Sequence, residues 1–148
     1  MKNKTAAPGK TSSKPKRETL TPLPKLIEQT QEKVNKAIRE RDVGSTCISC
    51  GSDKANQAGH YFAVKKSSIL RFHPVNINLQ CAYCNCYLHG NEAFYRIGLV
   101  EKWGEELVRE LEQLAVSQRL YKWSRMELME IQEALKHGTY GKNFVPFK

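Results

Sequence analysis

Apolar residues recur with helical spacing in the N-terminal third of the chain. Between residues 23 and 44 they share one face of a helix, with charged side chains on the other face: Leu26, Ile27, Val34 and Ile38. Pro24 suits the entrance of a helix, and Gly44 stands just past its end. The pattern predicts an amphipathic helix over residues 23–44 that packs on another part of the molecule.

The same spacing returns in the C-terminal third. Apolar residues that share one face predict a helix over residues 101–115: Val100, Trp103, Leu107, Leu111 and Leu114. Ser124 and Glu127 have the spacing of a capping box and start a further helix, which Gly138 ends. We therefore expect C-terminal helices within residues 99–138 and an irregular tail over residues 139–148.

Shorter apolar runs between these helices have the character of strands. Residues 61–64 and 69–72 are separated by Lys65-Lys66-Ser67-Ser68, which predicts a hairpin or a short strand–loop–strand. A loop with Pro74 and Asn76 follows. The chain therefore predicts an α+β fold, in which a small unit over residues 45–98 is flanked by one helix before it and two or three after it.

The charge of the chain points to an acidic partner. It has 148 residues, as expected for one domain, and its 24 Lys and Arg against 15 Asp and Glu give a formal net charge of +9. DNA or RNA is the expected partner, with an anionic membrane surface as the alternative. No apolar run approaches the length of a membrane span, and none follows the N-terminal lysines as in a secretory signal. We expect a cytoplasmic protein with no membrane partner.

The N-terminal segment has a composition of its own. Residues 1–22 are rich in Lys, Thr, Ser and Pro and contain almost nothing to bury, which predicts a disordered basic arm. Such an arm could contact phosphates through a nonspecific, salt-sensitive attraction, or could serve only to keep the protein in solution.

Two Cys-x-x-Cys pairs indicate a metal site. They are Cys47–Cys50 and Cys81–Cys84. A short turn lets both thiolates of a pair reach one tetrahedral ion, and two such knuckles close a four-sulfur shell typical of structural Zn²⁺. A redox pair would need a thioredoxin-like frame, which the pattern does not show. Binding of Zn²⁺ would supply folding energy to a segment too short and polar to fold on its own core. Cys86 is interpreted as a non-ligand.

Further motifs lie between and after the knuckles. In chain order they are Gln57-Ala-Gly-His60-Tyr61, Leu70-Arg71-Phe72, Gln80-Cys81, Cys84-Asn85, Gly90-Asn91 and Tyr95-Arg96. In this combination, residues 47–96 resemble the HNH nucleases with two zinc knuckles and, more closely, the NinG (Rap) recombination proteins of lambda-like phages. The resemblance implies a zinc-stapled ββα-metal (HNH-like) module flanked by amphipathic helices. It also implies a phage-encoded protein of the bacterial host cytoplasm, with structure-selective endonuclease action on branched DNA such as Holliday junctions and D-loops.

The chemistry of such a site can be assigned to residues. Phosphodiester hydrolysis needs a water, a base for its proton, and positive charge near the leaving oxygen. In the ββα-metal arrangement one strand ends in the histidine base, which assigns His60, at the start of the predicted strand over residues 61–64. Neutral imidazole suits this role near pH 7. A loop asparagine is expected to orient the ring, either Asn76 or, as the alternative, Asn78.

A catalytic divalent ion, Mg²⁺ or Mn²⁺, is expected beside this base. The helix predicted to begin at the second knuckle offers Asn85 as a ligand, and His89 four residues later on the same face. Many HNH sites place Asp or His directly before the base, where this chain has Gly59. Either His89 supplies the second ligand, or phosphate and water complete a weak site.

Basic residues surround the motif and are interpreted as phosphate contacts: Lys65, Lys66, Arg71 and Arg96. A solvated surface explains them almost as well. Three hypotheses follow: a metal-dependent DNA endonuclease, a non-catalytic zinc-knuckle module that binds nucleic acid, and a zinc adaptor that binds protein, which the net charge disfavours. A homodimer would suit the two cuts that a four-way junction needs. A recombinase or single-strand-binding protein is a further candidate partner.

Overall fold

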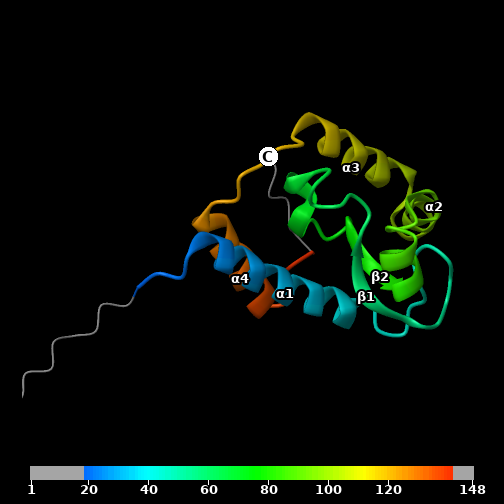
Figure 1. Cartoon of the computed structure of the whole chain (residues 1–148), viewed down its shortest axis with the longest axis horizontal. Coiled ribbons are helices and arrows are strands. Elements are labelled where there is room, and N and C mark those ends of the chain that lie inside the picture. The colour runs from blue at the N-terminus through cyan, green and yellow to red at the C-terminus, as the bar shows by residue number, and fades with distance from the viewer. Residues whose placement is uncertain (1–18, 142–148) are drawn as a thin grey trace, which may run out of the picture.

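Helices lie on two sides of a short antiparallel hairpin in the computed structural model, which describes residues 19–141 (Figure 1). Helices α1 (Leu23–Arg41) and α4 (Arg125–Lys136) pack together on one side. Helices α2 (Glu92–Trp103) and α3 (Glu105–Ser117) pack together on the other. The mixture of helices with a two-stranded sheet confirms the predicted α+β class.

The predicted basic arm lies largely in residues 1–18, which are outside the described residues, as is the segment 142–148 of the predicted tail. Both therefore stay predictions. Across residues 19–141, no helix is both long and apolar enough to cross a membrane.

Helix α1 is the predicted amphipathic helix, although it ends at Arg41, three residues before the predicted boundary at Gly44. Its buried side chains repeat every four residues along one face: Leu26, Thr30, Val34 and Ile38. The Thr30 hydroxyl donates to the Leu26 carbonyl at 2.7 Å and accepts from the Gln132 amide of α4 at 2.7 Å. The apolar stripe and this polar bridge dock α1 on α4.

Helix α4 begins with the predicted capping box. The Ser124 hydroxyl accepts from the backbone N–H of Glu127, and the Glu127 carboxylate accepts from the backbone N–H of Ser124 at 2.8 Å. Both donors belong to the first turn, where a helix has no internal acceptors. Leu128 and Ile131 face the core, whereas Met126 and Met129 are exposed.

The hairpin consists of β1 (Ala55–His60) and β2 (Ile77–Cys81), with Ala55 opposite Cys81 and His60 opposite Ile77. The predicted strands over residues 61–64 and 69–72 are wrong. The first run is irregular, and the second lies in the 3₁₀ helix η1 (Ser68–Phe72). The apolar run reflects burial, since Ile69, Leu70 and Phe72 are fully buried. A short helical turn can bury such residues as well as a strand can. The hairpin loop therefore spans residues 61–76.

The predicted helix over residues 101–115 is divided at Gly104, so that the prediction of one helix is wrong at this point. Gly104 has φ +86°, a conformation that residues with a Cβ rarely adopt. It ends α2 and starts α3 in a new direction. Val108 and Leu111 of α3 can therefore face the hairpin loop and bury their side chains there.

Two apolar clusters form the core. The α3 cluster joins α2, α3 and the hairpin loop: Tyr61, Ile69, Leu70, Val75, Tyr95, Leu99, Val108, Leu111 and Ala115. The α4 cluster joins α1, α4 and the hairpin: Leu26, Val34, Ile38, Phe72, Ile77, Trp123, Leu128 and Ile131. Because Phe72 and Leu70 belong to different clusters, the loop that follows β1 is held from both sides.

A buried charged group, here called the Asp42 hub, ties the end of α1 to β2 and α2. The Asp42 carboxylate is 3% exposed and accepts from Arg41 and Lys102, both at 2.7 Å. The Asn78 side-chain oxygen accepts from both cations at 3.0 Å. Burial opposes ionisation of Asp42, but these partners outweigh it and lower its pKa. Through these contacts the hub fixes the position of β2.

Candidate metal centre and histidine site

Four cysteine thiols meet in one cluster. The Sγ atoms of Cys47, Cys50, Cys81 and Cys84 all lie within 4.8 Å of one another, with Cys50 and Cys81 3.7 Å apart. Tetrahedral zinc with sulfurs at about 2.3 Å separates those sulfurs by about 3.8 Å. The four thiols could therefore hold a metal ion, and their chemistry fits structural zinc. Among the described His, Cys, Asp and Glu residues, no other group of three or more is close enough to do so.

Local backbone turns aim these thiols at a common centre. In the first knuckle, the Cys47 N–H donates to the Ser52 carbonyl at 2.8 Å and closes the turn. In the second, the Cys84 N–H lies 3.4 Å from the Cys81 sulfur. The Asn91 side-chain amide donates to the Cys84 sulfur at 3.4 Å. Such N–H donors stabilise sulfur in its thiolate form, which is the form that binds metal.

The thiols differ in acidity. Burial disfavours the Cys47 thiolate, but backbone hydrogen bonds, the largest from Cys81, lower its pKa to about 7. Burial raises the pKa of Cys84 to about 12. Because a metal-bound thiol is deprotonated, Cys84 depends on the metal for its ionised state more than Cys47 does.

His60 is the last residue of β1, not the first residue of a following strand. Its ring Nε2 lies 3.0 Å from the Arg71 carbonyl oxygen. A carbonyl can only accept, so Nε2 carries the proton of the neutral ring and Nδ1 keeps a free lone pair. Burial lowers the pKa of His60 below 6.5, the Arg71 charge acts in the same direction, and the hydrogen bond to the Arg71 carbonyl only partly opposes them. The ring is therefore neutral at pH 7.

The prediction that Asn76 orients this ring is wrong, because its side chain is bound to the loop backbone. Its Oδ1 accepts from the Phe62 N–H at 2.8 Å, and its Nδ2 donates to the carbonyls of Phe62 and Leu70. Asn78, the alternative, belongs to the Asp42 hub. Asn76 closes the loop immediately beside Arg71, whose carbonyl makes the contact with the imidazole.

The peptide group before His60 is fixed by a residue of α2. The Tyr95 hydroxyl donates to the Gly59 carbonyl at 2.7 Å and accepts from the Asn78 amide at 3.3 Å. Tyr95 is fully buried, and burial raises the pKa of its phenol, which stays protonated as a donor. The strand end that carries His60 therefore has little freedom to move.

Asn85 lies in the short π-helical turn η2 (Tyr83–Tyr87), which begins within the second knuckle. Its Nδ2 donates to the Gln57 side-chain oxygen at 2.8 Å. Its Oδ1 faces Gly59, since a Cβ on that glycine would lie 3.1 Å from it. The structure thus places the predicted ligand Asn85 directly beside the residue that precedes His60.

The prediction that His89 shares a helical face with Asn85 is wrong. The helical turn ends at Tyr87, and His89 follows it in the left-handed region at φ +50° with an exposed side chain. The turn nevertheless passes close to the site, because a Cβ on Gly90 would lie 3.9 Å from the His60 carbonyl oxygen.

Two of the predicted phosphate contacts are engaged with carboxylates. Arg96 pairs with Glu112 at 2.7 Å and with Glu105 at 2.8 Å. Lys66 pairs with Glu92 at 2.5 Å. These pairs reduce the positive charge that either side chain can present to a phosphate.

The other two predicted contacts differ from each other. The Arg71 guanidinium is half-buried, donates to Gln31 at 3.1 Å and lies over the Phe72 ring at 5.6 Å. Lys65 is exposed in the turn after β1. Of the four predicted contacts, Lys65 is therefore the most accessible to a phosphate.

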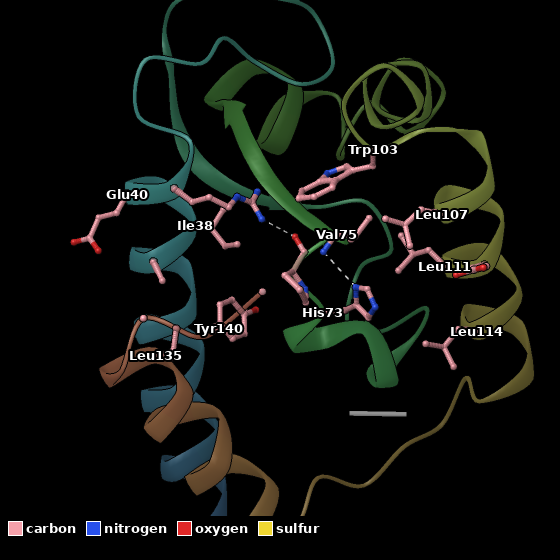
Figure 2. A pocket seen from close by; sticks show the side chains of 16 residues that line it. Ile38, Glu40, His73, Val75, Trp103, Leu107, Leu111, Leu114, Leu135 and Tyr140 are labelled. Atoms are coloured by element: carbon pink, nitrogen blue, oxygen red, sulfur yellow. Dashed lines mark hydrogen bonds between the residues drawn. The ribbon is translucent and has the colours of Figure 1, made fainter. Parts of the chain in front are cut away.

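A cavity of about 620 Å³ lies between α1 and α3 (Figure 2). The apolar side chains that line it include Ile38, Val75, Leu111, Leu114 and Leu135. His73 also lines it, accepts from the Val75 N–H at 3.3 Å, and has its pKa lowered to about 4 by burial. None of the predicted catalytic residues lines this cavity, so the histidine site is elsewhere.

Sequence reasoning missed two residues of the site. In the sequence, Gln80 stands out only as the neighbour of Cys81 and Tyr95 only as part of a motif, and neither was given a role. Both are fully buried polar side chains, which a pattern of apolar positions cannot find. The signal that could have found Gln80 is the pairing of its strand with β1, which depends on the true strand boundaries.

The fold and the site together define a small α+β protein with four clustered cysteines that could hold a metal ion and a half-buried histidine at the end of a hairpin strand. Residues 1–141 match the family model described as Bacteriophage Lambda NinG protein, and the chain belongs to this family. The predicted family is therefore confirmed. No solved structure matches the chain.

Curated relatives carry the same family name. The chain is 43% identical over 95 residues to protein ninG of Escherichia phage lambda, covering 63% of this chain and 47% of that protein. It is 38% identical over 115 residues to protein ninG of Salmonella phage P22, covering 76% and 55%. It is 37% identical over 125 residues to protein ninG of Enterobacteria phage H19B, covering 83% and 59%. The matched part thus spans about half the length of these relatives.

Proposed function

We propose that this protein is a divalent-metal-dependent DNA endonuclease of phage recombination, which cuts branched DNA with His60 as general base. One observation carries the proposal. The His60 ring donates through Nε2 to the Arg71 carbonyl at 3.0 Å, which leaves Nδ1 unprotonated on a ring whose pKa is lowered. A neutral ring held in this tautomer keeps a basic nitrogen that can take a proton from a water.

The proposed reaction uses this geometry. A water bound at Nδ1 gives a proton to His60 as its oxygen attacks the phosphorus. The bond between phosphorus and the 3′ oxygen breaks with its electron pair going to that oxygen, which takes a proton from solvent water. The products are a 5′ phosphate on one strand end and a 3′ hydroxyl on the other. The Arg71 carbonyl stabilises the imidazolium that forms, because it accepts a stronger hydrogen bond from the charged ring.

Asn85 would hold the divalent ion through its side-chain oxygen. That oxygen lies beside Gly59, the residue that directly precedes His60. Oxygen donors of this kind suit Mg²⁺ and Mn²⁺. When bound, such an ion supplies positive charge for the leaving oxygen. Structural zinc at the cysteines would hold η2, and with it Asn85, against the hairpin.

The substrate class comes from the likeness to the NinG proteins and from charge. Residues 19–141 contain 16 Lys and Arg against 14 Asp and Glu, so that most of the net charge of +9 belongs to the rest of the chain. Residues 1–18 alone contain six Lys and Arg and one Glu. We assign the general attraction to phosphates to this segment and the choice of cutting position to the His60 site.

The test is a cleavage assay with zinc-loaded protein on labelled four-way junction, D-loop and plain duplex, with and without added Mg²⁺ or Mn²⁺. The variants are His60→Ala and, as a matched control, His137→Ala, since His137 is exposed near the end of α4. We expect wild type and His137→Ala to cut branched DNA when the ion is added. His60→Ala should bind equally well and cut at least about 100-fold more slowly.

The alternative is a zinc-knuckle module that binds nucleic acid without cutting it. Wild type that binds junctions tightly but cuts no substrate with any divalent ion would establish this alternative and end the nuclease proposal. Equal cutting by wild type and His60→Ala would remove His60 from the mechanism.

A further inference from the structure

Gly59 is surrounded on its side-chain side. A Cβ at this position would lie 2.0 Å from the Oε1 atom of Gln80 and 2.8 Å from its Cδ atom. The backbone of Gly59 is not in the left-handed region, so another residue could adopt its conformation. Glycine is required here because the Gln80 side chain occupies the space that a Cβ would need.

The Gln80 amide has a defined orientation. Its Nε2 donates to the Gly90 carbonyl and to the Ser49 hydroxyl, both at 2.8 Å. Because the Gly90 carbonyl can only accept, the nitrogen must be on that side and the oxygen must face Gly59. The alternative placement would set two oxygens against each other.

The Gln80 oxygen is a buried acceptor that lacks a hydrogen-bond partner among the residues described here. The whole side chain is fully buried. An unsatisfied acceptor in such a place destabilises the fold, and folded proteins rarely tolerate one without a reason. A bound group that accepts the oxygen's lone pair would remove this cost.

A second amide oxygen points to the same place. Asn85 Oδ1 lies 3.1 Å from the point where a Cβ of residue 59 would stand, and Gln80 Oε1 lies 2.0 Å from it. The Asn85 nitrogen is turned away, toward the Gln57 oxygen at 2.8 Å. Side-chain amide oxygens are among the ligands that hard divalent cations take in proteins.

We infer that Gln80 Oε1 and Asn85 Oδ1 together bind the divalent ion, with Gln80 taking the place of the ligand that residue 59 lacks. This inference rests on the proposed nuclease function and names its metal ligands. It replaces His89, which is exposed and lies beyond the helical turn. It also explains Gly59, since a side chain there would displace the Gln80 oxygen.

The test measures Mn²⁺ binding to the zinc-loaded protein by electron paramagnetic resonance, independently of cleavage. Gln80→Ala removes the oxygen and should weaken Mn²⁺ binding about tenfold or more. Adding Gly59→Asp to Gln80→Ala places a carboxylate in the vacated space and should restore binding to about the wild-type level or better. His89→Ala is the control and should bind Mn²⁺ as wild type does.

Several results would overturn the inference. They are wild type that binds no Mn²⁺, Gln80→Ala that binds as wild type does, loss of binding in His89→Ala, and failure of Gly59→Asp to rescue Gln80→Ala. An ordered water on Gln80 in place of an ion would give the second of these results. Zinc content and circular dichroism check that each variant is folded.

If Gln80→Ala does not retain zinc, the wild type provides the answer by nuclear magnetic resonance. Titration with Mg²⁺ should shift the side-chain amide signals of both Gln80 and Asn85, and an unmoved Gln80 signal overturns the inference. The cleavage assay separates the two proposals. Gln80-dependent ion binding without cleavage ends the nuclease proposal alone, whereas His60-dependent cleavage with Gln80-independent ion binding ends only the ligand assignment.

Discussion

The hairpin end that carries the four cysteines buries few apolar side chains, whereas the contact between α1 and α4 buries many. Around the cysteines, the buried cluster consists of Cys47, Cys81 and Cys84 with partly buried Ala55 against it. Between α1 and α4, the α4 cluster contains eight buried side chains, among them Trp123 and Phe72. We therefore expect the first region to depend on a bound metal ion for its stability, whereas apolar burial stabilises the second.

The difference between these regions shows why the candidate site lies where it does. β1 has the sequence Ala-Asn-Gln-Ala-Gly-His, with almost nothing apolar to bury. Polar side chains can gather on this strand because the Tyr95 hydroxyl binds its Gly59 carbonyl and the Asp42 hub binds the Leu79 N–H of its partner strand β2. The candidate site thus lies in the part of the fold that buries the fewest apolar side chains.

Removal of zinc should have the largest effect. Structural zinc contributes about 10–16 kcal/mol in small zinc domains, and little apolar burial could replace it here. Cys84→Ser should lose zinc and lose amide-exchange protection across β1 and β2, while α1 and α4 stay protected. Hydrogen exchange read by mass spectrometry gives the comparison directly.

Cys86→Ser is the matched control, since Cys86 is exposed two residues later. It should keep its zinc and its exchange pattern. Equal protection of the hairpin in Cys84→Ser and Cys86→Ser would contradict the claim that the metal holds this region.

Breaking the Asp42 hub should have the next largest effect. Asp42→Ala leaves Arg41 and Lys102 without their buried carboxylate, which should lower the free energy of unfolding by about 3–5 kcal/mol. Glu40→Ala, two residues earlier, removes only an exposed pair with Lys36 and should cost less than about 0.5 kcal/mol. Urea unfolding of the two variants checks this, and similar midpoints would refute the role assigned to the hub.

Acid should weaken the protein through His73. Burial lowers its pKa to about 4, against an ordinary value of 6.5. Above pH 6.5 the residue is neutral in both states, and its contribution to stability is complete. As the pH falls from 6.5 to 4, the unfolded chain takes up the proton first, and about 1–3 kcal/mol of stability is lost.

The check is urea unfolding of zinc-loaded wild type and His73→Gln at pH 7 and pH 5. Wild type should lose more stability between these pH values than the variant does. His60, whose pKa is also lowered, contributes with the same sign to both proteins. Identical losses would show that His73 is not the group responsible.

The smallest effect concerns phosphate contacts. Lys65→Ala should lower the slope of log affinity against log salt for junction DNA by about 1, as expected for one lost phosphate contact. Arg96→Ala should leave this slope unchanged, because Arg96 is occupied by Glu105 and Glu112. Fluorescence anisotropy across a salt series measures both slopes, and the reverse order would restore Arg96 as a DNA contact.

The features that sequence reasoning found are local ones. The four-cysteine cluster follows from the spacing within each Cys-x-x-Cys pair, and the four thiols do lie close together. Helix α4 follows from a repeat of apolar residues and a capping box within a few residues of each other. Such signals depend on neighbouring residues and so can be read directly from the chain.

The strands could not be found in this way, because they depend on distant partners. β1 has no β-branched or aromatic residue and is extended through pairing with β2. All five residues of β2 are buried, so it lacks the alternation that a half-exposed strand shows. The apolar residues Ile69 and Phe72 instead led us to predict a strand where the structure has the 3₁₀ helix η1. This helix buries both side chains without extending the chain.

Within the site, the sequence could not show which backbone groups contact the functional side chains. The partner of the His60 ring is the Arg71 carbonyl, and any residue has a carbonyl. Asn76 acts one step away, by fixing the loop that presents this carbonyl. Side-chain identity could therefore indicate the candidate histidine but not the group that orients its ring.

The most direct test of the proposed role of His60 is single-turnover cleavage of a four-way junction by zinc-loaded wild type and His60→Gln in Mg²⁺. The glutamine Nε2 occupies about the same position as the ring Nε2 and can still donate to the Arg71 carbonyl, but the amide cannot take a proton from water. We expect unchanged junction affinity and zinc content, with cleavage at least about 100-fold slower. Cleavage by His60→Gln at the wild-type rate would contradict this role.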